Sequence, residues 1–227
     1  MAAFSGDQAL CSSLAMSKDV HSEVAMKLFQ LDDISMVTES MRQSAKQLSY
    51  GLMYGMSEQG LERRFRESAV NSREILDRHE SEYPALYELK DALVNEARRM
   101  LYAETLLGRR LVLENITSSN TVDRKKAERQ AVNMPIQGTQ ADMLKIAMVE
   151  LDRALQHRGL ESKLFLCIHD ELLLLAKDEE VDEVVDLVRQ EMVNALELPN
   201  GVLPKVKIGV GKNWHLAGKD RKGVRPL

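Results

Sequence analysis

The chain has 227 residues, 44% of them hydrophobic and 29% charged, which is enough for one large domain or two small ones with a substantial core. No apolar run approaches the roughly 18 residues of a membrane-spanning helix, and the first residues lack the pattern of a secretory signal. Cys11 and Cys167 lack the spacing of a disulfide framework or a structural zinc site. We therefore expect an intracellular protein that does not enter a membrane. The net charge of -4 excludes a uniformly basic coat but not a nucleic-acid partner, because residues 201–227 carry 7 Lys and Arg against 1 Asp or Glu.

The first half of the chain has the pattern of helices with short breaks. Apolar residues recur at helical spacing, and Gly55 follows one such stretch as a plausible C-cap. The expected elements are a helix beginning near residue 18, helices over 38–54 and 85–101, a strand-like segment over 106–113 that Gly108 interrupts, and a loop over 114–122.

The second half mixes helices with short strands. Expected here are a helical stretch over 123–156 in which Pro135 forces a kink or break, a buried hairpin of two apolar runs over 164–168 and 172–175, a helix over 179–196, and a final strand over 206–210. The basic tail after Trp214, with Lys219, Arg221, Lys222 and Arg225, is expected to be a solvated terminus. The predicted class is α+β, rich in helix, with a small antiparallel sheet in the second half.

Two carboxylates lie between the two apolar runs of the predicted hairpin. Asp170 and Glu171 follow His169 at its centre, and burying such a pair is costly unless something neutralises it. Carboxylate oxygens are the ligands that Mg²⁺ prefers, so the pattern favours a metal site. The alternative is an ordinary turn with two solvated carboxylates.

Four side chains recur at steps of four residues and therefore project from one face of a helix: Arg42, Lys46, Tyr50 and Tyr54. Two cations followed by two aromatic rings could bind a polyphosphate at one end and stack a flat base at the other. The alternative is a solvated basic stripe beside two core tyrosines.

Arg129, Asn133 and Gln137 form a second row with the same spacing. These side chains can donate hydrogen bonds to purine N3 and pyrimidine O2, the minor-groove acceptors that all base pairs share. Such a face would suit a protein that grips DNA without reading its sequence. The alternative is a polar network between helices around Pro135.

Taken together, these rows and the carboxylate pair resemble family A DNA polymerases, the bacterial DNA polymerase I type. Residues 42–57 are similar to the fingers helix of that family, 128–142 to its palm segment upstream of the active site, and 168–172 to its catalytic hairpin. Residues 105–110 also match, and 209–214 are similar to its C-terminal strand, so the resemblance covers about residues 3–216. It implies an incomplete right-hand polymerase fold, with residues 1–122 mostly fingers and residues 123–227 the C-terminal palm.

The resemblance also implies a role for each residue in DNA-directed DNA synthesis, in replication or repair. Arg42 and Lys46 would bind the phosphates of the incoming deoxynucleoside triphosphate, which His21 would also reach. Tyr50 would lie against the sugar of that nucleotide, and Tyr54 would lie at the templating site.

The remaining residues would contact DNA and metal. Arg129, Asn133 and Gln137 would follow the minor groove of the primer-template DNA, with His169 near the primer end. Asp170 would be a ligand of two catalytic Mg²⁺ ions, with Glu171 as a supporting carboxylate, in a two-metal phosphoryl transfer to the primer 3′-hydroxyl.

One part of the family pattern is expected to lie before Met1. Residues 3–7 look like the segment just after the first palm motif of the family, which carries the other metal-binding Asp, and neither Asp7 nor Asp19 is placed to substitute for it. One carboxylate pair does not hold two cations in the usual bridged geometry. The isolated chain is therefore expected to be nearly inactive unless a separate chain supplies the thumb and the first motif.

A different class of function stays open at this stage. The chain could be a non-catalytic DNA-binding or assembly module that kept the grip on DNA and lost the chemistry, or, less specifically, a helical scaffold. A pure binder gains little from a buried acidic pair, which favours the catalytic interpretation. Binding of primer-template without nucleotide would favour the module.

Overall fold

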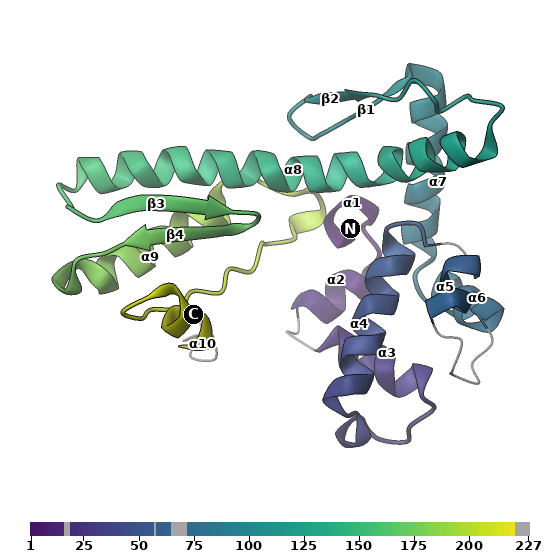
Figure 1. Cartoon of the computed structure of the whole chain (residues 1–227), viewed down its shortest axis with the longest axis horizontal. Coiled ribbons are helices and arrows are strands. Elements are labelled where there is room, and N and C mark those ends of the chain that lie inside the picture. The colour runs from purple at the N-terminus through teal and green to yellow at the C-terminus, as the bar shows by residue number, and fades with distance from the viewer. Residues whose placement is uncertain (16–18, 57, 65–71, 221–227) are drawn as a thin grey trace. The chain divides into compact units, whose positions relative to one another are not determined.

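A computed structural model describes residues 1–15, 19–56, 58–64 and 72–220, so the basic tail after residue 220 lies outside the described residues. The chain divides into two compact units, Met1–Gly138 and Thr139–Leu227, each of which is described by itself. The elements of the first unit are helices α1 (Ala2–Ser5), α2 (Gln8–Ala15), α3 (Val20–Leu28), α4 (Glu39–Met53), α5 (Glu58–Arg64), α6 (Ser72–Glu82) and α7 (Pro84–Met100), strands β1 (Tyr102–Glu104) and β2 (Arg110–Val112), and the beginning of helix α8 (Thr121–His157) (Figure 1).

Helix α4, which carries the predicted Arg42–Tyr54 row, has a definite beginning and end. The Thr38 hydroxyl accepts a hydrogen bond from the Met41 amide at 3.3 Å and so caps the first turn. At the other end Tyr54 is the C-cap and Gly55 follows with φ +84, a left-handed conformation that favours glycine. The helix expected over 38–54 therefore ends where its sequence signals place it.

Among the described residues of the first unit, three apolar clusters hold its elements together. One joins α4 to α5 through Leu48, Leu52 and Leu61, with residues of α6 packed against it. The second joins α1 and α2 to α7, and the third joins α7, β1 and α8 around Ile116, which is fully buried. Helix α3 packs along α4 (Figure 1), which brings residues from before and after position 30 onto one surface.

The segment after α7 is a hairpin, not the single strand expected over 106–113. Strands β1 and β2 pair antiparallel, with Ala103 opposite Leu111. The turn between them is held by Thr105, whose hydroxyl accepts hydrogen bonds from the amides of Leu107 and Arg109 at 3.3 and 3.2 Å. Three-residue strands are too short to show a periodic pattern, so the sequence revealed only the second strand.

Helix α8 continues through Pro135. Of the two outcomes predicted there, a kink or a break, the break is wrong, and the kink stays a prediction. Proline removes one backbone donor and crowds the preceding turn. Packing offsets that cost, since Ala131 and Ile136 on either side of it are buried. The boundary between the two units falls inside this helix, after Gly138. The boundary expected between residues 122 and 123 separates the fingers from the palm. A division into compact units does not test that assignment, so it stays a prediction.

The second unit contains the rest of α8, strands β3 (Lys163–Ile168) and β4 (Glu171–Leu175), and helices α9 (Val181–Asn194) and α10 (Trp214–Asp220). Strands β3 and β4 pair antiparallel in a two-stranded sheet, which confirms the small antiparallel sheet of the predicted class. Helix α9 buries Val184, Leu187 and Val188 against Leu151 and Leu155 of α8, and Leu172 and Leu174 of β4 pack against the same cluster.

The hairpin is covered on one face only, so the prediction that it is buried is wrong. Phe165 is 64% exposed and Leu175 is 61% exposed. A register shift between Leu164 and Leu166 leaves Phe165 as the extra residue of a bulge. A continuous apolar run is typical of a strand covered on both faces, but within the described part of the second unit only α8 and α9 supply a covering layer.

Residues 206–210 do not form the expected final strand. In the described structure this segment has no assigned secondary structure, although Ile208 packs against the α8–α9 cluster. The alternation of the sequence predicts an extended chain, but a strand also needs a hydrogen-bonded neighbour. No helix among the described residues is both long and apolar enough to cross a membrane.

Candidate active site

The predicted row on α4 forms a continuous surface of cations and rings. The ammonium group of Lys46 lies 5.9 Å from the centroid of the Tyr50 ring. The rings of Tyr50 and Tyr54 are 6.4 Å apart and nearly parallel, at 13°. Tyr50 is exposed, whereas Tyr54 is half-buried, and burial raises the pKa of the Tyr54 hydroxyl. The row therefore presents Lys46 and Tyr50 to an approaching ligand.

Helix α3 adds His21 to this surface. The His21 ring lies 5.5 Å from that of Tyr50, so the structure brings together the five residues predicted to bind nucleotide. Burial lowers the pKa of His21, and Lys46 and Arg42 lower it further against the opposing charge of Asp19. Its Nδ1 atom is buried without a hydrogen-bond partner in the described structure. A neutral imidazole beside two fixed cations can donate one hydrogen bond to an anionic ligand.

Arg42 is held by Asp19, a residue outside the predicted site. Its Nε donates to Asp19 Oδ2 at 2.6 Å. Asp19 precedes α3, and its carboxylate also accepts a hydrogen bond from the Ser22 hydroxyl at 2.8 Å. The sequence does show a helix start here, because Asp is a common N-cap, but a partner 23 residues away leaves no local signal.

The predicted minor-groove row lies on α8 within the first unit. Arg129 and Gln137 are exposed and Asn133 is half-buried. The Asn133 Oδ1 atom is buried with no hydrogen-bond partner among the described residues. A β-carbon built on Gly55 would lie 3.2 Å from Cγ of Arg129, so the end of α4 contacts the start of this row. The two predicted rows thus meet at Gly55.

The predicted catalytic turn belongs to the second unit. His169 and Asp170 form the two-residue turn between β3 and β4, with Ile168 paired to Glu171. His169 has φ +55, an uncommon conformation for a non-glycine residue. Asp170 is exposed, and Glu171 is half-buried at the first position of β4.

The donor set at this turn fits a magnesium ion in part. Asp170 and Glu171 are adjacent and supply carboxylate oxygens, and Mg²⁺ in enzymes is often held by one or two carboxylates together with substrate phosphates and water. In the described ranges of the chain, no three His, Cys, Asp or Glu side chains gather closely enough to hold a metal by themselves. The turn therefore fits one end of a shared metal site.

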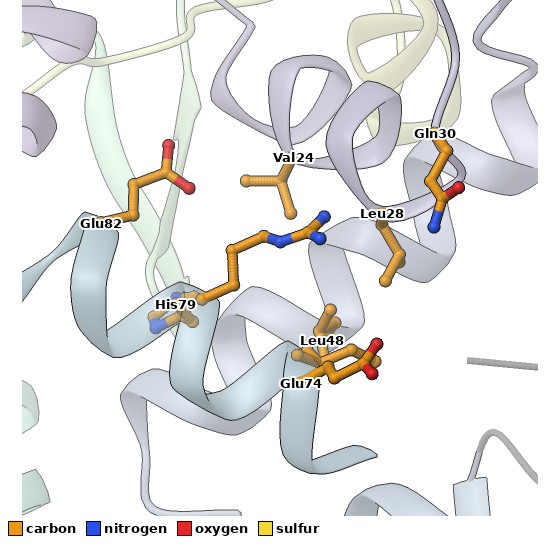
Figure 2. A pocket seen from close by; sticks show the side chains of 9 residues that line it. Val24, Leu28, Gln30, Leu48, Glu74, His79 and Glu82 are labelled. Atoms are coloured by element: carbon orange, nitrogen blue, oxygen red, sulfur yellow. The ribbon is translucent and has the colours of Figure 1, made fainter. Parts of the chain in front are cut away.

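A pocket in the first unit lies away from all these residues. It is lined by residues of α3, α4 and α6, and Figure 2 shows the side chains of Val24, Leu28 and Leu48 pointing toward its middle. Leu48 lies on the opposite side of α4 from Lys46 and Tyr50, since residues two apart on a helix are separated by about 200°. The pocket is thus not part of the surface predicted to bind nucleotide.

Comparisons with known proteins identify the family. The model of DNA polymerase family A matches residues 1–216. The chain is 38% identical over 217 residues to DNA polymerase I of Lactococcus lactis, which covers 96% of this chain and 24% of that protein. It is 38% identical over 215 residues to DNA polymerase I of Caldicellulosiruptor bescii, covering 95% of this chain and 25% of that protein.

A solved structure agrees with these relatives. The polymerase domain of Pol1 from M. smegmatis, in complex with DNA primer-template and dNTP, is similar with a TM-score of 0.89 and 37% identity. The match covers 96% of this chain and 38% of that domain. The chain thus spans about a quarter of the length of the relatives that it matches. On these grounds the chain belongs to DNA polymerase family A.

Proposed function

We propose that this chain provides the nucleotide-gripping surface and one carboxylate pair of a DNA-directed DNA polymerase. The proposed reaction is template-directed addition of a deoxynucleotide to a primer 3′-hydroxyl, on DNA inside the cell. The observation that carries the proposal is the surface formed by α3 and α4, where the Tyr50 ring lies 5.5 Å from the His21 ring and 5.9 Å from the ammonium group of Lys46. Similarity to proteins named DNA polymerase I over 96% of the chain supports it.

The α3–α4 surface suits a nucleoside triphosphate. Arg42 and Lys46 are two fixed positive charges one helical turn apart, and guanidinium and ammonium groups bind phosphate through charge-assisted hydrogen bonds. The exposed ring of Tyr50 offers an apolar face beside them for the sugar of the same ligand. Tyr54, stacked behind it, would border the templating base. Cations at one end and rings at the other match the two ends of a nucleotide.

The α8 row suits the minor groove of primer-template DNA. Arg129 and Gln137 are exposed at steps of four residues and carry donors for acceptors common to all base pairs. The unpartnered Oδ1 of Asn133 belongs to an amide that could reach the same groove. His169, placed at the tip of the catalytic turn, would lie near the primer end.

Asp170 and Glu171 would hold magnesium in the complete polymerase. When bound, Mg²⁺ promotes deprotonation of the primer 3′-hydroxyl and neutralises the charge of the triphosphate and of the leaving pyrophosphate. Asp170, exposed at the turn, can reach an ion without rearrangement of the hairpin. Arg42 and Lys46 would stabilise the negative charge that develops on the phosphates during transfer.

Binding and extension measurements test this function. Titration of the chain with a deoxynucleoside triphosphate should give saturable binding that Arg42→Ala and Lys46→Ala each weaken by ~10-fold or more, because a charge-assisted hydrogen bond contributes about 1.5–3 kcal/mol. Lys125→Ala, at an exposed lysine of α8, is the matched control and should bind as the wild type does. Equal affinity in all four proteins would refute the assignment of the α3–α4 surface.

Primer extension with Mg²⁺ and all four deoxynucleotides tests the chemistry. The chain is assayed alone and together with a polypeptide carrying the thumb and first palm motif of a relative, which we propose as its partner. Asp170→Ala should abolish any extension observed, and Asp178→Ala, at another exposed carboxylate of the second unit, should not. Primer-template binding without extension, both by the chain alone and with the added polypeptide, would instead support the non-catalytic binding module.

A further inference from the structure

An ion pair ties the beginning of α3 to the arginine of the nucleotide surface. The Asp19 carboxylate receives a hydrogen bond from Nε of Arg42 at 2.6 Å, across 23 residues of sequence. Both side chains stay partly accessible, at 33% for Arg42 and 41% for Asp19. His21, two residues along, contacts the Tyr50 ring on the same surface. The pair therefore lies within the proposed nucleotide site, on its α3 side.

The contact with Asp19 uses the Nε edge of the Arg42 guanidinium group and does not involve its Nη end. Asp19 takes the Nε–H, whereas the two Nη groups form the end of the fork that grips a phosphate with parallel hydrogen bonds. Among the described residues the other anionic neighbour of Arg42 is Glu39, whose Oε1 lies 3.5 Å from Nη1. Glu39 is 72% exposed and one turn away on α4, so it restrains the fork little. A residue that competed with phosphate would occupy the Nη end.

Asp19 is itself fixed, which makes it a firm support. The Ser22 side chain is buried, and its hydroxyl donates to Asp19 Oδ2 at 2.8 Å. The Ser22 amide approaches Oδ1 at 3.4 Å, as expected for an N-cap. Burial alone would raise the pKa of Asp19, but the hydrogen bonds from Arg42 and Ser22 outweigh burial and hold it at about 2. The carboxylate is thus ionised at any pH at which the protein would work.

We propose that Asp19 is a positioning residue for nucleotide binding. By holding the Nε edge of Arg42 against the start of α3, it aims the Nη fork at the phosphates and keeps Arg42, Lys46 and His21 on one surface. The inference rests on the proposed function, because it assigns Asp19 a part in the same nucleotide site. It gives Asp19 a role distinct from that of a metal ligand.

The experiment measures the affinity of the whole chain for inorganic tripolyphosphate and for a deoxynucleoside triphosphate. The variants are Asp19→Asn, Asp19→Ala, Arg42→Lys and the two Asp19 substitutions combined with Arg42→Lys. Glu39→Gln is the matched control, since it also removes a carboxylate beside Arg42 but leaves the Nε contact intact. Asn is a good N-cap, so Asp19→Asn keeps the helix start while removing the charge. Thermal unfolding of each protein reports whether it is folded.

We expect Asp19→Asn and Asp19→Ala to weaken binding of both ligands about 5- to 20-fold, as the loss of a charge-assisted contact implies. Glu39→Gln should leave it within about twofold, in line with exposed pairs. In the Arg42→Lys background the Asp19 substitutions should have no further effect, because Lys lacks the Nε–H. A helix-capping role alone would weaken binding equally in both backgrounds.

Several results would overturn the proposal. Tighter binding by Asp19→Asn than by Glu39→Gln would make Asp19 a competitor of the phosphates. Unchanged affinity in Asp19→Asn, or an equal loss with and without Arg42, would remove the positioning role while leaving the proposed function standing. If Arg42→Lys and Lys46→Ala also leave triphosphate affinity unchanged, the nucleotide surface itself is wrong, and the inference falls with it.

Discussion

Two glycines share a left-handed backbone conformation, and one of them lies against a residue of the predicted site. Gly55 has φ +84 and Gly108 has φ +79, both in the left-handed region. Around Gly108 nothing lies within 4 Å of a built β-carbon, whereas at Gly55 that atom would be 3.2 Å from Cγ of Arg129. The two positions share the backbone requirement and differ only in the neighbour.

Substitution of each by alanine separates these effects. Gly55→Ala and Gly108→Ala should each lower the free energy of unfolding by about 1–2 kcal/mol, because a left-handed L-residue is strained. Gly55→Ala alone should also weaken primer-template binding severalfold, since Arg129 must move away from the new methyl group. Urea unfolding and fluorescence anisotropy with a labelled duplex measure the two quantities. Equal DNA affinity in both variants would show that Arg129 adjusts without loss.

At this scale the sequence predicts what is local. The spacing of Arg42, Lys46 and Tyr50 fixes their common face, because a helix repeats every 3.6 residues. The bond between Asp19 and Arg42 and the contact between Gly55 and Arg129 each join distant segments. Those contacts depend on how α3 and α8 pack against α4, which no local pattern specifies.

Packing between elements is close where α8 passes the β1–β2 turn. A β-carbon on Gly138 would lie 2.5 Å from Cγ2 of Thr105 and 3.1 Å from Sδ of Met134. Thr105 is buried and its hydroxyl holds the turn through two backbone amides. A helix interior normally favours Ala over Gly by about 1 kcal/mol, so this glycine is required by the neighbour.

A double-mutant cycle tests that requirement. Gly138→Ala should destabilise the chain by about 1–3 kcal/mol through overpacking, despite its better helix propensity. Thr105→Ser removes the Cγ2 methyl and keeps the hydroxyl, so the double variant should recover most of that loss. The free energies come from urea unfolding followed by circular dichroism. Additive losses in the double variant would place the strain elsewhere.

The junction of α6 and α7 contains a buried histidine that makes stability depend on pH. Burial lowers the pKa of His79 to about 4, with Lys90 adding to the decrease and Asp7 opposing it. His79 is 7% exposed, its Nδ1 lies 3.1 Å from the Tyr87 hydroxyl, and its ring is 4.9 Å from that of Tyr83. The folded chain therefore keeps this imidazole neutral over a range where the unfolded chain protonates it.

Acid should destabilise the fold within that range. Because the unfolded state binds the extra proton between pH 6.5 and 4, the free energy of unfolding should fall by about 3 kcal/mol as the pH drops across it. His79→Gln should lower the free energy of unfolding at pH 7 and make it depend less on pH. His157→Gln, at an exposed site, should leave the pH dependence as it is in the wild type. Urea unfolding at several pH values gives the slopes. A slope unchanged in His79→Gln would assign the acid sensitivity to other groups.

The elements themselves follow from the sequence where a pattern is long enough. Helices α4, α7 and α9 were predicted because several turns repeat the same apolar face. The strand expected over 206–210 was wrong because an alternating pattern does not reveal whether a neighbouring strand exists. Pro135 did not end α8, because buried neighbours on both sides offset a local penalty that sequence rules treat alone.

At the scale of the whole chain, its apolar residues are not all used in its own cores. In the second unit Leu172 and Leu174 of β4 pack against α8 and α9, but Phe165 and Leu175 on the same hairpin are 64% and 61% exposed. Exposed apolar surface on an open sheet favours association with other chains. The sequence predicted an apolar hairpin correctly and could not show which face is covered.

Substitutions on the two faces should therefore have opposite consequences. Phe165→Thr combined with Leu175→Thr keeps the β-forming character of both positions and should change the free energy of unfolding by less than about 0.5 kcal/mol. The same variant should reduce self-association in light scattering. Leu174→Ala, on the packed face, should cost about 2 kcal/mol and leave association unchanged in the folded protein. A double variant as destabilised as Leu174→Ala would show that the outer face of the hairpin is covered in solution.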